Sequence, residues 1–229
     1  MPIGASMADR VRAQNMGMSI VGLAQGIPFI QMGSDMLRSK SLDRNSYDSG
    51  DWFNRVYWDY SQNNFGQGLP PSGDNSSRWD IMRPLLTNTA LDSTTDDIQS
   101  AAAHLREVLR IRKSSKLFRL ETETDINAHV SFYNAGPTPQ DGLIVMSLAD
   151  GADIDPNYET MLVFFNANKV QQTFTIAEAI GKGFALHPLQ LDDIDADAVV
   201  KTAAFDDATG QFTIPARTTA VFVSTNLVT

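Results

Sequence analysis

The chain has 229 residues, 42% of them hydrophobic and 20% charged, which indicates a soluble globular protein with a substantial core. A net charge of −9 argues against nucleic-acid and acidic-membrane binding, because both partners select an excess of Lys and Arg. The absence of Cys excludes disulfides, thiolate nucleophiles and Cys-type metal sites. No apolar stretch approaches the roughly 18 to 20 residues of a membrane span, and the first ten residues do not resemble an export signal.

The charge distribution divides the chain into two regions. Residues 1–120 contain 14 Lys and Arg against 12 Asp and Glu, whereas residues 121–229 contain 4 against 15. The first region has the longest helical patterns, and the second has short apolar runs separated by turn residues. We therefore predict one domain at 1–120, rich in helix, and a β domain at 121–229.

A helix followed by a strand is predicted at the start of the chain. Ser6 and Asp9 fit a capping box, and Gly26 ends the helical pattern. The apolar face of this helix contains Met7, Val11, Met18 and Val21. The short apolar run Ile27–Met32 suits a strand that is buried on both faces of a parallel sheet.

Residues 33–91 show no periodicity and form a loop of about 60 residues that is rich in Ser, Asn, Asp, Gly and aromatic residues. Because such loops are uncommon in compact domains unless they are functional, we interpret it as a binding loop. Ser93 with Asp96 then predicts the start of a second helix, which extends to about Arg112. Its apolar face consists of Ile98, Ala101, Ala102, Leu105, Val108 and Leu109.

From residue 127 the pattern is typical of an antiparallel β-sandwich, with Asp207–Gly210 as a hairpin turn. Seven runs predict strands: His129–Tyr133, Leu143–Leu148, Met161–Phe165, Thr173–Ile176, Phe184–Leu189, Gln211–Ile214 and Ala220–Val223. Aromatic residues in these runs could form a sugar-binding surface, but at strand spacing a core role is favoured for Phe132, Tyr133, Phe164 and Phe165.

Few residues suggest a cofactor. His104, His129 and His187 lack metal-ligand spacing, and we interpret them as structural. The acidic run Asp192–Asp197 offers oxygen ligands, but it lacks the Gly and the terminal Glu of a calcium loop. Nucleotide-binding and serine-hydrolase motifs are not found. We predict no cofactor for this chain, and calcium binding by a parent enzyme stays open.

The segment Leu37–Arg55 combines carboxylate, guanidinium, amide and aromatic groups in one loop. A sugar site needs these groups, because charged side chains bind pairs of hydroxyls and aromatic rings pack on C–H faces. From the residues alone, an equally good interpretation is that the polar groups satisfy the backbone of the loop.

Residues 26–41 and 43–55, with the sequences GIPFIQMGSDMLRSKS and DRNSYDSGDWFNR, resemble type I pullulanases of the α-amylase clan. The resemblance covers the whole chain, more loosely after Leu120. It implies an α/β plus all-β fold: the last helix, strand and helix of a (β/α)8 barrel, with a long substrate loop at 33–91, followed by an antiparallel β-sandwich.

The resemblance also implies an activity, namely hydrolysis of α-1,6-glucosidic bonds in pullulan, amylopectin and limit dextrins with retention of configuration. In this clan the nucleophilic Asp, the Glu acid/base and a third Asp follow the fourth, fifth and seventh barrel strands. We find no such motifs in the 229 residues. We therefore expect no catalytic residue here, an inactive fragment, and dependence on a missing N-terminal barrel segment of the same enzyme.

Asp51 and Arg55 have the spacing of the Asp and Arg that bind glucose units in this clan, so the resemblance implies that they contact an α-glucan substrate. Trp52 and Asn54 are further candidates for this contact. The alternative that Arg55 only pairs with Asp51 to stiffen the loop stays open. Arg38 and Asp48 are expected to brace the loop.

A second function remains open, a stand-alone carbohydrate-binding or accessory module without catalytic activity. The apolar run Ile27–Met32 argues against this function, because an apolar strand of this kind needs a neighbouring strand on each of its edges. The localisation cannot be inferred; the resemblance implies a bacterial parent, for which secretion or a cell-surface location is open.

Overall fold

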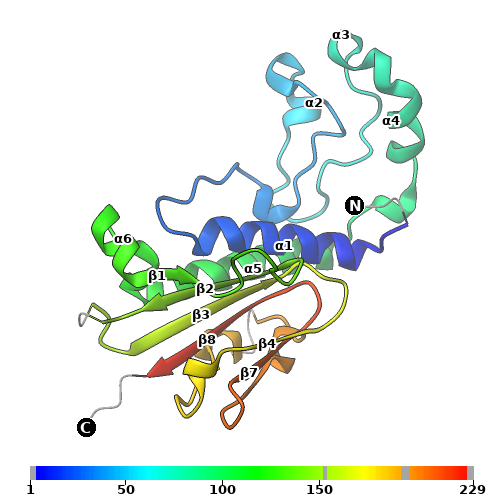
Figure 1. The fold of residues 1–229 in the computed structure, drawn as a ribbon. Coiled ribbons are helices and arrows are strands. Elements are labelled where there is room, and N and C mark those ends of the chain that lie inside the picture. The colour runs from blue at the N-terminus through cyan, green and yellow to red at the C-terminus, as the bar shows by residue number, and fades with distance from the viewer. Residues whose placement is uncertain (1–3, 152–153, 192–195, 226–229) are drawn as a thin grey trace. The chain divides into compact units, whose positions relative to one another are not determined.

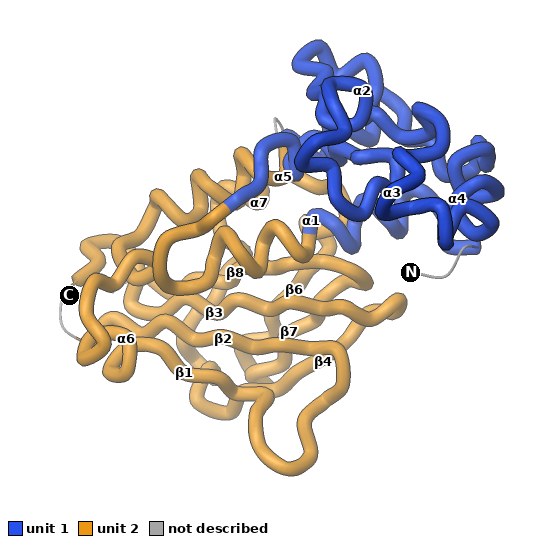
Figure 2. Tube along the Cα trace, turned by 90° about the horizontal axis from the view of Figure 1, so that it is seen from above, with its two compact units in different colours: residues 1–15, 30–102 blue, residues 16–29, 103–229 orange. Residues whose placement is uncertain are grey.

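The computed structural model describes residues 4–151, 154–191 and 196–225 (Figure 1). The chain forms two compact units (Figure 2): unit 1 consists of residues 1–15 and 30–102, and unit 2 of residues 16–29 and 103–229. The two long helices, α1 (Met7–Leu23) and α5 (Thr95–Ser114), each contribute to both units. Every strand in the described ranges belongs to unit 2.

Helix α1 begins where its sequence predicts. Ser6 Oγ accepts a hydrogen bond from the backbone N–H of Asp9 at 3.1 Å, which satisfies one of the N–H groups that have no partner inside a helix. The helix ends at Leu23, two residues before the expected Gln25.

Helix α5 uses a different cap from the predicted one. Thr94 Oγ1 accepts from the N–H of Asp97 at 3.2 Å, and Asp97 Oδ2 accepts from the N–H of Thr94 at 2.8 Å. The prediction of Ser93 and Asp96 was wrong because the two adjacent pairs have the same three-residue spacing, so spacing could not select between them.

The predicted apolar faces of the long helices are only partly buried. Val21 and Leu109 are 41% exposed. The buried members are Val11, Met18, Ile98, Ala101, Ala102, Leu105 and Val108.

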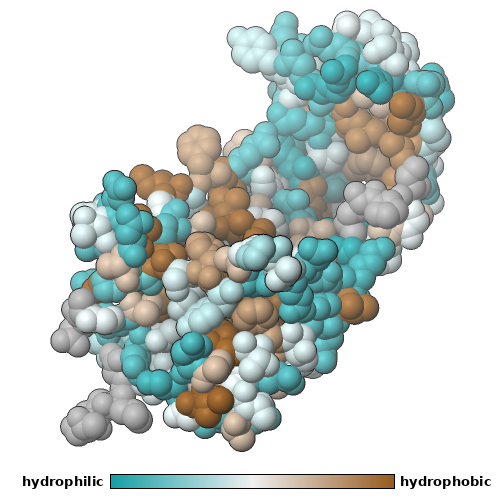
Figure 3. Space-filling model, in the orientation of Figure 1, coloured by the Kyte–Doolittle hydropathy of each residue, from teal (hydrophilic) through white to brown (hydrophobic). Residues whose placement is uncertain are grey.

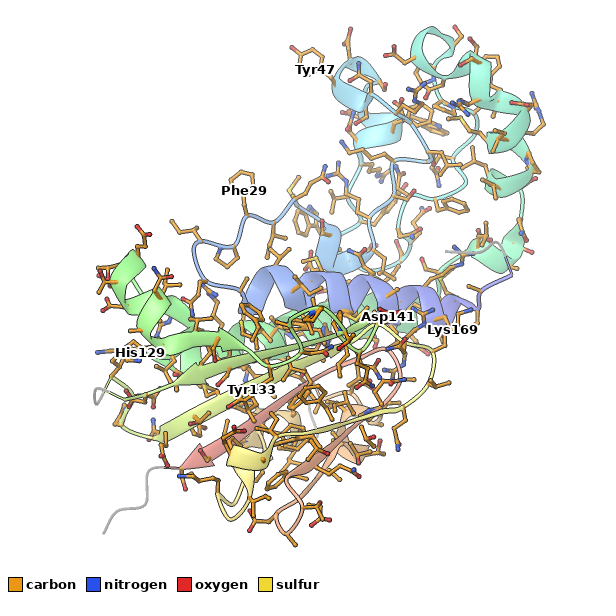
Figure 4. The ribbon with its side chains drawn as sticks, viewed as in Figure 1. Phe29, Tyr47, His129, Tyr133, Asp141 and Lys169 are labelled. Carbon is orange, nitrogen blue, oxygen red and sulfur yellow. The ribbon has the colours of Figure 1, made fainter. Side chains whose placement is uncertain are left out.

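Residues 27–31 form no strand, in contrast to the prediction for Ile27–Met32. Ile27 is 94% exposed and Phe29 95% exposed, and Phe29 points away from the ribbon in Figure 4. A parallel strand exists only through hydrogen bonds to neighbouring strands, and no described segment pairs with this one. Hydrophobic residues reach the surface elsewhere as well (Figure 3).

The loop of residues 33–91 belongs entirely to unit 1 and contains only short helices, as the lack of periodicity predicts. In chain order they are η1 (Ser34–Met36), η2 (Ser46–Asp48), α2 (Asp51–Asn54), α3 (Ser72–Asn75), η3 (Ser76–Arg78), α4 (Trp79–Leu86) and η4 (Thr89–Leu91).

Unit 2 contains two antiparallel sheets. The five-stranded sheet has the order β1 (Val130–Phe132), β2 (Leu143–Ala149), β3 (Tyr158–Asn166), β8 (Thr218–Thr225) and β5 (Ala185–Leu186). The three-stranded sheet has the order β4 (Gln172–Thr175), β7 (Gln211–Ile214) and β6 (Ala204–Asp206). All seven predicted runs contain a strand, although β5 is only two residues long and β6 was missed.

The β6–β7 hairpin turns at residues 207–210, as predicted. Gly210 has φ of 69°, and a Cβ on it would lie 2.4 Å from the carbonyl oxygen of Ile176. This position therefore requires glycine for two reasons, the left-handed backbone and the close approach.

Short helices of unit 2 were not predicted. Helix α6 (Glu123–His129) ends at His129, which was expected to begin a strand, and Thr122 Oγ1 caps it by accepting from the N–H of Asp125 at 3.1 Å. The others are η5 (Lys116–Arg119), η6 (Ala177–Ala179), α7 (Pro188–Leu191) and η7 (Val200–Thr202).

The hydrophobic core of unit 2 lies between the two sheets. Phe164 of β3, Phe212 of β7 and Phe222 of β8 meet there, with ring centroids 4.9 Å apart for Phe164 and Phe212 and 5.0 Å for Phe212 and Phe222. The opposite face of the five-stranded sheet is covered by helical segments of the same unit (Figure 1). Of the four aromatic residues considered above, Phe164 and Phe165 are buried, whereas Phe132 and Tyr133 are exposed.

Candidate functional site

The loop of residues 33–91 is held in shape by hydrogen bonds from side chains to its own backbone. Ser41 Oγ donates to the carbonyl of Asn64 at 2.8 Å and accepts from the N–H of Gln67 at 3.1 Å. The amide of Asn64 donates to the carbonyls of Ser39, at 3.3 Å, and Trp52, at 3.2 Å. These bonds tie together segments that are far apart within the loop, so the loop is ordered without a sheet or a long helix.

Most of the unusual backbone conformations lie in this loop. Of the non-glycine residues with positive φ in the described ranges, all but Arg217 belong to it: Leu37, Ser41, Leu42, Tyr60 and Asn64. Such conformations cost free energy and persist where the surroundings enforce them, commonly at binding sites. The loop is therefore the best candidate for a functional site.

Arg38 braces the loop, as predicted. Its guanidinium donates to the carbonyl of Met32 at 3.1 Å and, through a short hydrogen bond, to the carbonyl of Asn54. Gly33 makes room for the Arg38 side chain, because a Cβ on Gly33 would lie 2.7 Å from Arg38 Cδ. Arg38 therefore joins the beginning of the loop to the end of helix α2.

Asp48 does not brace the loop as predicted, since its exposed side chain forms no hydrogen bond within the described ranges. Asp43 has this role instead. Burial raises the pKa of Asp43, but the hydrogen bonds that its Oδ1 accepts from the Asn75 amide, at 2.9 Å, and from the N–H of Asn45, at 3.2 Å, outweigh this effect, and the net pKa is below its usual range. Sequence alone did not distinguish the two carboxylates because both lie among similar turn residues.

Asp51 is the first residue of α2 and is exposed. In the part of the chain that the structure describes, no group donates a hydrogen bond to its carboxylate. The backbone around it is fixed, because the amide of Asn54 donates to the carbonyls of Ser46, at 2.7 Å, and Gly50, at 3.0 Å. Asp51 therefore presents an ionisable acceptor from an ordered turn, and its oxygens are available to a ligand.

Arg55 does not pair with Asp51. Helix α2 ends at Asn54, and Arg55 has extended backbone angles, so the spacing of four residues does not place the two side chains on one helical face. The Arg55 guanidinium carbon lies instead 4.5 Å from the centroid of the Tyr57 ring. This cation–π contact orients the guanidinium while leaving N–H donors for another partner.

Trp52 and Asn54 have different surroundings. Trp52 Nε1 donates to the carbonyl of Gln67 at 2.7 Å, while the side chain remains 63% exposed. The orientation of the indole is thus fixed and much of its surface is open. The amide N–H groups of Asn54 are both used inside the loop, and only its side-chain oxygen remains as an acceptor.

A pocket of about 380 Å³ also opens in unit 1, and it contains none of the four predicted site residues. Its polar lining includes Arg10 and Gln14 of α1. Gln14 donates to the carbonyl of Ser34 at 3.3 Å and so links the helix to the loop. These residues could not be predicted from the sequence, because a polar residue on an amphipathic helix has no distinguishing pattern.

No group of three or more potential metal ligands occurs among the described residues. The histidines lie in separate places, with His104 bonded to Ser19, His129 to the carbonyl of Ala149, and His187 to Ser114. Most of the acidic run Asp192–Asp197, considered above for calcium, lies outside the described residues.

The family of the chain follows from comparison with known proteins. The model of the family described as "Alpha-1,6-glucosidases, pullulanase-type, C-terminal" matches residues 60–225. This is more than half of the sequence, and the chain belongs to this family.

The relatives agree with this assignment. Pullulanase 1, chloroplastic, of Arabidopsis thaliana is 42% identical over 97% of this chain, and pullulanase of Klebsiella pneumoniae is 36% identical over 95%. The chain covers only 24% and 20% of these two proteins. It thus corresponds to about a quarter of their length or less.

Solved structures show the same fold. PulA from Klebsiella oxytoca superposes with a TM-score of 0.89 at 32% identity, covering 99% of this chain and 21% of that chain. The maltotriose complex of PulA from Klebsiella pneumoniae gives 0.90 at 33% identity, covering 99% and 24%.

The relatives named above include a chloroplastic plant protein as well as bacterial ones. Proteins of this family are therefore not confined to bacteria, which was the expected origin of the parent enzyme. Within the described ranges, no helix combines the length and hydrophobicity needed to cross a bilayer.

Proposed function

We propose that this chain is the C-terminal part of a pullulanase-type debranching enzyme that hydrolyses α-1,6-glucosidic bonds in pullulan, amylopectin and limit dextrins. Membership of the pullulanase-type α-1,6-glucosidase family indicates the class of reaction. The chain supplies substrate-binding residues, with Asp51 and Arg55 as the main contacts and Trp52 and Asn54 beside them. The catalytic carboxylates come from a part of the enzyme outside this sequence.

The observation that carries the binding role is the contrast between Asp51 and its surroundings. The turn is braced by Arg38 and Asn54, yet the Asp51 carboxylate itself has no partner within the described ranges. A carboxylate fixed in this way accepts hydrogen bonds from two adjacent sugar hydroxyls without reorganisation of the loop. Arg55, oriented by Tyr57, donates to a neighbouring hydroxyl.

These contacts hold a glucose unit in register during the reaction. In a retaining glycosidase two carboxyl groups about 5 Å apart act on the bond as nucleophile and acid/base. A sugar bound by Asp51 positions the chain of glucose units relative to that pair, and this positioning lowers the entropic part of the barrier.

The exposed run Ile27–Met32 supports the proposal that the chain completes a larger domain. In the complete enzyme we expect this run to form the last strand of a (β/α)8 barrel, between α1 and the loop of residues 33–91, with residues 121–229 as the sandwich. Burying Ile27 and Phe29 against neighbouring strands stabilises each by about 1.5–3 kcal/mol. A stand-alone binding module has no reason to expose these side chains.

The test of the binding role is Asp51→Ala in the complete enzyme. Because charge-assisted hydrogen bonds to the substrate are lost, we expect KM for pullulan to rise about 10- to 100-fold, while the melting temperature stays unchanged. Steady-state kinetics on pullulan measure the effect.

Asp48→Ala is the matched control, because Asp48 is an exposed carboxylate three residues away that forms no hydrogen bond within the described ranges. It should leave KM unchanged. Equal KM values for the Asp51→Ala and wild-type enzymes would refute the role of Asp51.

A further inference from the structure

The pocket of about 380 Å³ in unit 1, which we call the α1 pocket, is lined by the first half of helix α1, by the loop of residues 33–91 and by Ser93. All of its lining residues belong to unit 1 (Figure 2). The polar ones are Arg10, Gln14, Ser34, Arg38, Asn63 and Ser93. The candidate sugar contacts Asp51 and Arg55 are not among them, so the α1 pocket is a separate site.

The lining of the α1 pocket is positively charged. Its ionisable side chains are the guanidiniums of Arg10 and Arg38, and no described Asp or Glu lines it. The composition does not predict this, because the chain has 27 Asp and Glu against 18 Lys and Arg. Asp9 and Asp35 are close to lining residues in the sequence, but neither lines the pocket. The pocket therefore favours an anion over a neutral molecule or a cation.

Arg38 is held in place at the wall of the pocket. Its guanidinium donates to the carbonyl of Met32 at 3.1 Å and, through a short hydrogen bond, to the carbonyl of Asn54. A guanidinium has more N–H donors than these two bonds use, and the Nε–H of Arg38 is buried without a partner in the described part of the chain. Because the loop already orders this side chain, a ligand that binds it loses little further conformational entropy.

Ser93 supplies a second polar group without a protein partner. Its hydroxyl is buried and forms no hydrogen bond with any described residue. Thr94 provides the N-cap of α5, so the Ser93 hydroxyl has no role in starting that helix. Buried polar groups normally have hydrogen-bond partners. This hydroxyl and the Nε–H of Arg38, both at the wall of one pocket, therefore indicate a ligand with acceptor atoms.

Arg10 brings the second guanidinium to the pocket from the first turn of α1. Its Nε donates to the carbonyl of Ala5 at 3.3 Å, which holds the side chain near the start of the helix. The positive end of the helix dipole adds to the charge there. One turn further along, Gln14 donates to the carbonyl of Ser34 at 3.3 Å. The helix wall and the loop wall of the pocket are thus joined.

The α1 pocket has room for more than an inorganic ion. Its volume of about 380 Å³ is over twice the roughly 150 Å³ of a cavity that holds one benzene ring. Met7, Val11 and Leu37 form the apolar part of its lining. A fitting ligand therefore combines an anionic group with an organic part as large as a substituted ring.

We propose that the α1 pocket binds a phosphomonoester of a single sugar. A phosphate group carries a charge of about −1.5 to −2 at pH 7 and has three acceptor oxygens, which suit the guanidiniums of Arg10 and Arg38 and the hydroxyl of Ser93. A carboxylate has less charge and fewer oxygens, so it would leave part of this set unused. The choice of a sugar as the organic part rests on the proposed function, whereas the phosphate site does not.

The test is a titration of the 229-residue chain with glucose 6-phosphate, followed in amide NMR spectra. We expect the signals of Arg10, Gln14, Arg38 and Ser93 to shift and to saturate at millimolar concentrations or below, which is typical of a ligand with few heavy atoms. Glucose and inorganic phosphate are the comparison ligands. Each lacks one part of the proposed ligand and should bind at least about tenfold more weakly.

Arg10→Gln should weaken the binding of glucose 6-phosphate about tenfold or more, because it removes one of the two guanidiniums. Arg12→Gln is the matched control, since Arg12 lies in the same helix but does not line the pocket, and it should leave the affinity unchanged. Ser93→Ala gives a second test with the same direction as Arg10→Gln, and it breaks no hydrogen bond of the described side chain. The ligand-free spectra show whether each variant is folded.

These measurements require neither catalysis nor the candidate sugar contacts, so the double variant Asp51→Ala with Arg55→Ala should bind glucose 6-phosphate as the wild type does. Absence of the shifts, or glucose binding as tightly as glucose 6-phosphate, would overturn the proposal. Equal effects of Arg10→Gln and Arg12→Gln would also overturn it. Inorganic phosphate binding as tightly as glucose 6-phosphate would show that the pocket does not recognise the sugar.

Discussion

Replacing Arg112 by Ala should lower the free energy of unfolding of the chain by about 3 kcal/mol or more. The buried guanidinium donates to the carbonyls of Gly22 at 3.0 Å, Ala24 at 2.7 Å and Gly26, at and beyond the end of α1. The last carbonyls of a helix have no intrahelical partner, and a cation there also interacts favourably with the helix dipole. Gly22 is buried, and its carbonyl left without a donor costs about 1–3 kcal/mol, while Ala24 and Gly26 are exposed and the loss of their bonds to the charged guanidinium adds about 1.5–3 kcal/mol in total.

Chemical denaturation of the wild-type and variant chains measures this change, and the melting temperature should fall by roughly 6 °C or more. Lys113→Ala is the control, because Lys113 is an exposed cation in the same last turn of α5. Its effect should stay within about 0.5 kcal/mol. Equal stability of the Arg112→Ala and Lys113→Ala chains would show that Arg112 does not hold the end of α1.

The free energy of unfolding of the chain should decrease as the pH is lowered, because of His187. This side chain is almost fully buried, and burial lowers its pKa from 6.5 to about 4. The neutral ring is held by two bonds: Nδ1 accepts from the N–H of Leu189 at 3.1 Å, and Nε2 lies 3.1 Å from Ser114 Oγ. Since Ser114 Oγ donates to the carbonyl of Ile111, Nε2 is the nitrogen that carries the proton.

The direction follows from linkage between proton binding and folding. Above pH 6.5 the ring is neutral in both states; as the pH falls from about 6.5 to 4, the unfolded chain binds a proton that the folded chain does not, and folding loses about 3 kcal/mol. Denaturation of the wild-type and His187→Gln chains at pH 7 and pH 4 isolates this effect, because the carboxylates are common to both. The difference in free energy of unfolding between the wild-type and His187→Gln chains should be about 3 kcal/mol smaller at pH 4 than at pH 7. A difference that does not change with pH would refute the assignment of the low pKa to His187.

Patterns with a fixed period predicted the regular elements of this chain well. Short apolar runs at Leu143–Leu148 and Ala220–Val223 located β2 and β8, and the helical period located α5. The N-cap of α5 was predicted at the wrong residue, Ser93 in place of Thr94, because both residues satisfy the capping rule. The run Ile27–Met32 failed for a different reason, since a strand needs backbone partners that a pattern within one segment cannot supply.

The candidate site was only partly predictable. Composition identified the segment Leu37–Arg55, and the structure shows Asp51 exposed and without a partner within the described ranges. The orientation of Arg55 over Tyr57 depends on the end of α2 at Asn54, which no spacing rule predicts.

The central claim is that this chain contributes substrate-binding residues and no catalytic carboxylates. Its most direct test is the release of reducing sugar from pullulan by the purified chain, with the intact mass of 25.1 kDa confirmed on the same sample. The account predicts no release above a blank without protein. Release of maltotriose by a chain of that mass would contradict it, and Asp35, Asp43, Asp48 and Asp51 would then have to be tested as catalysts.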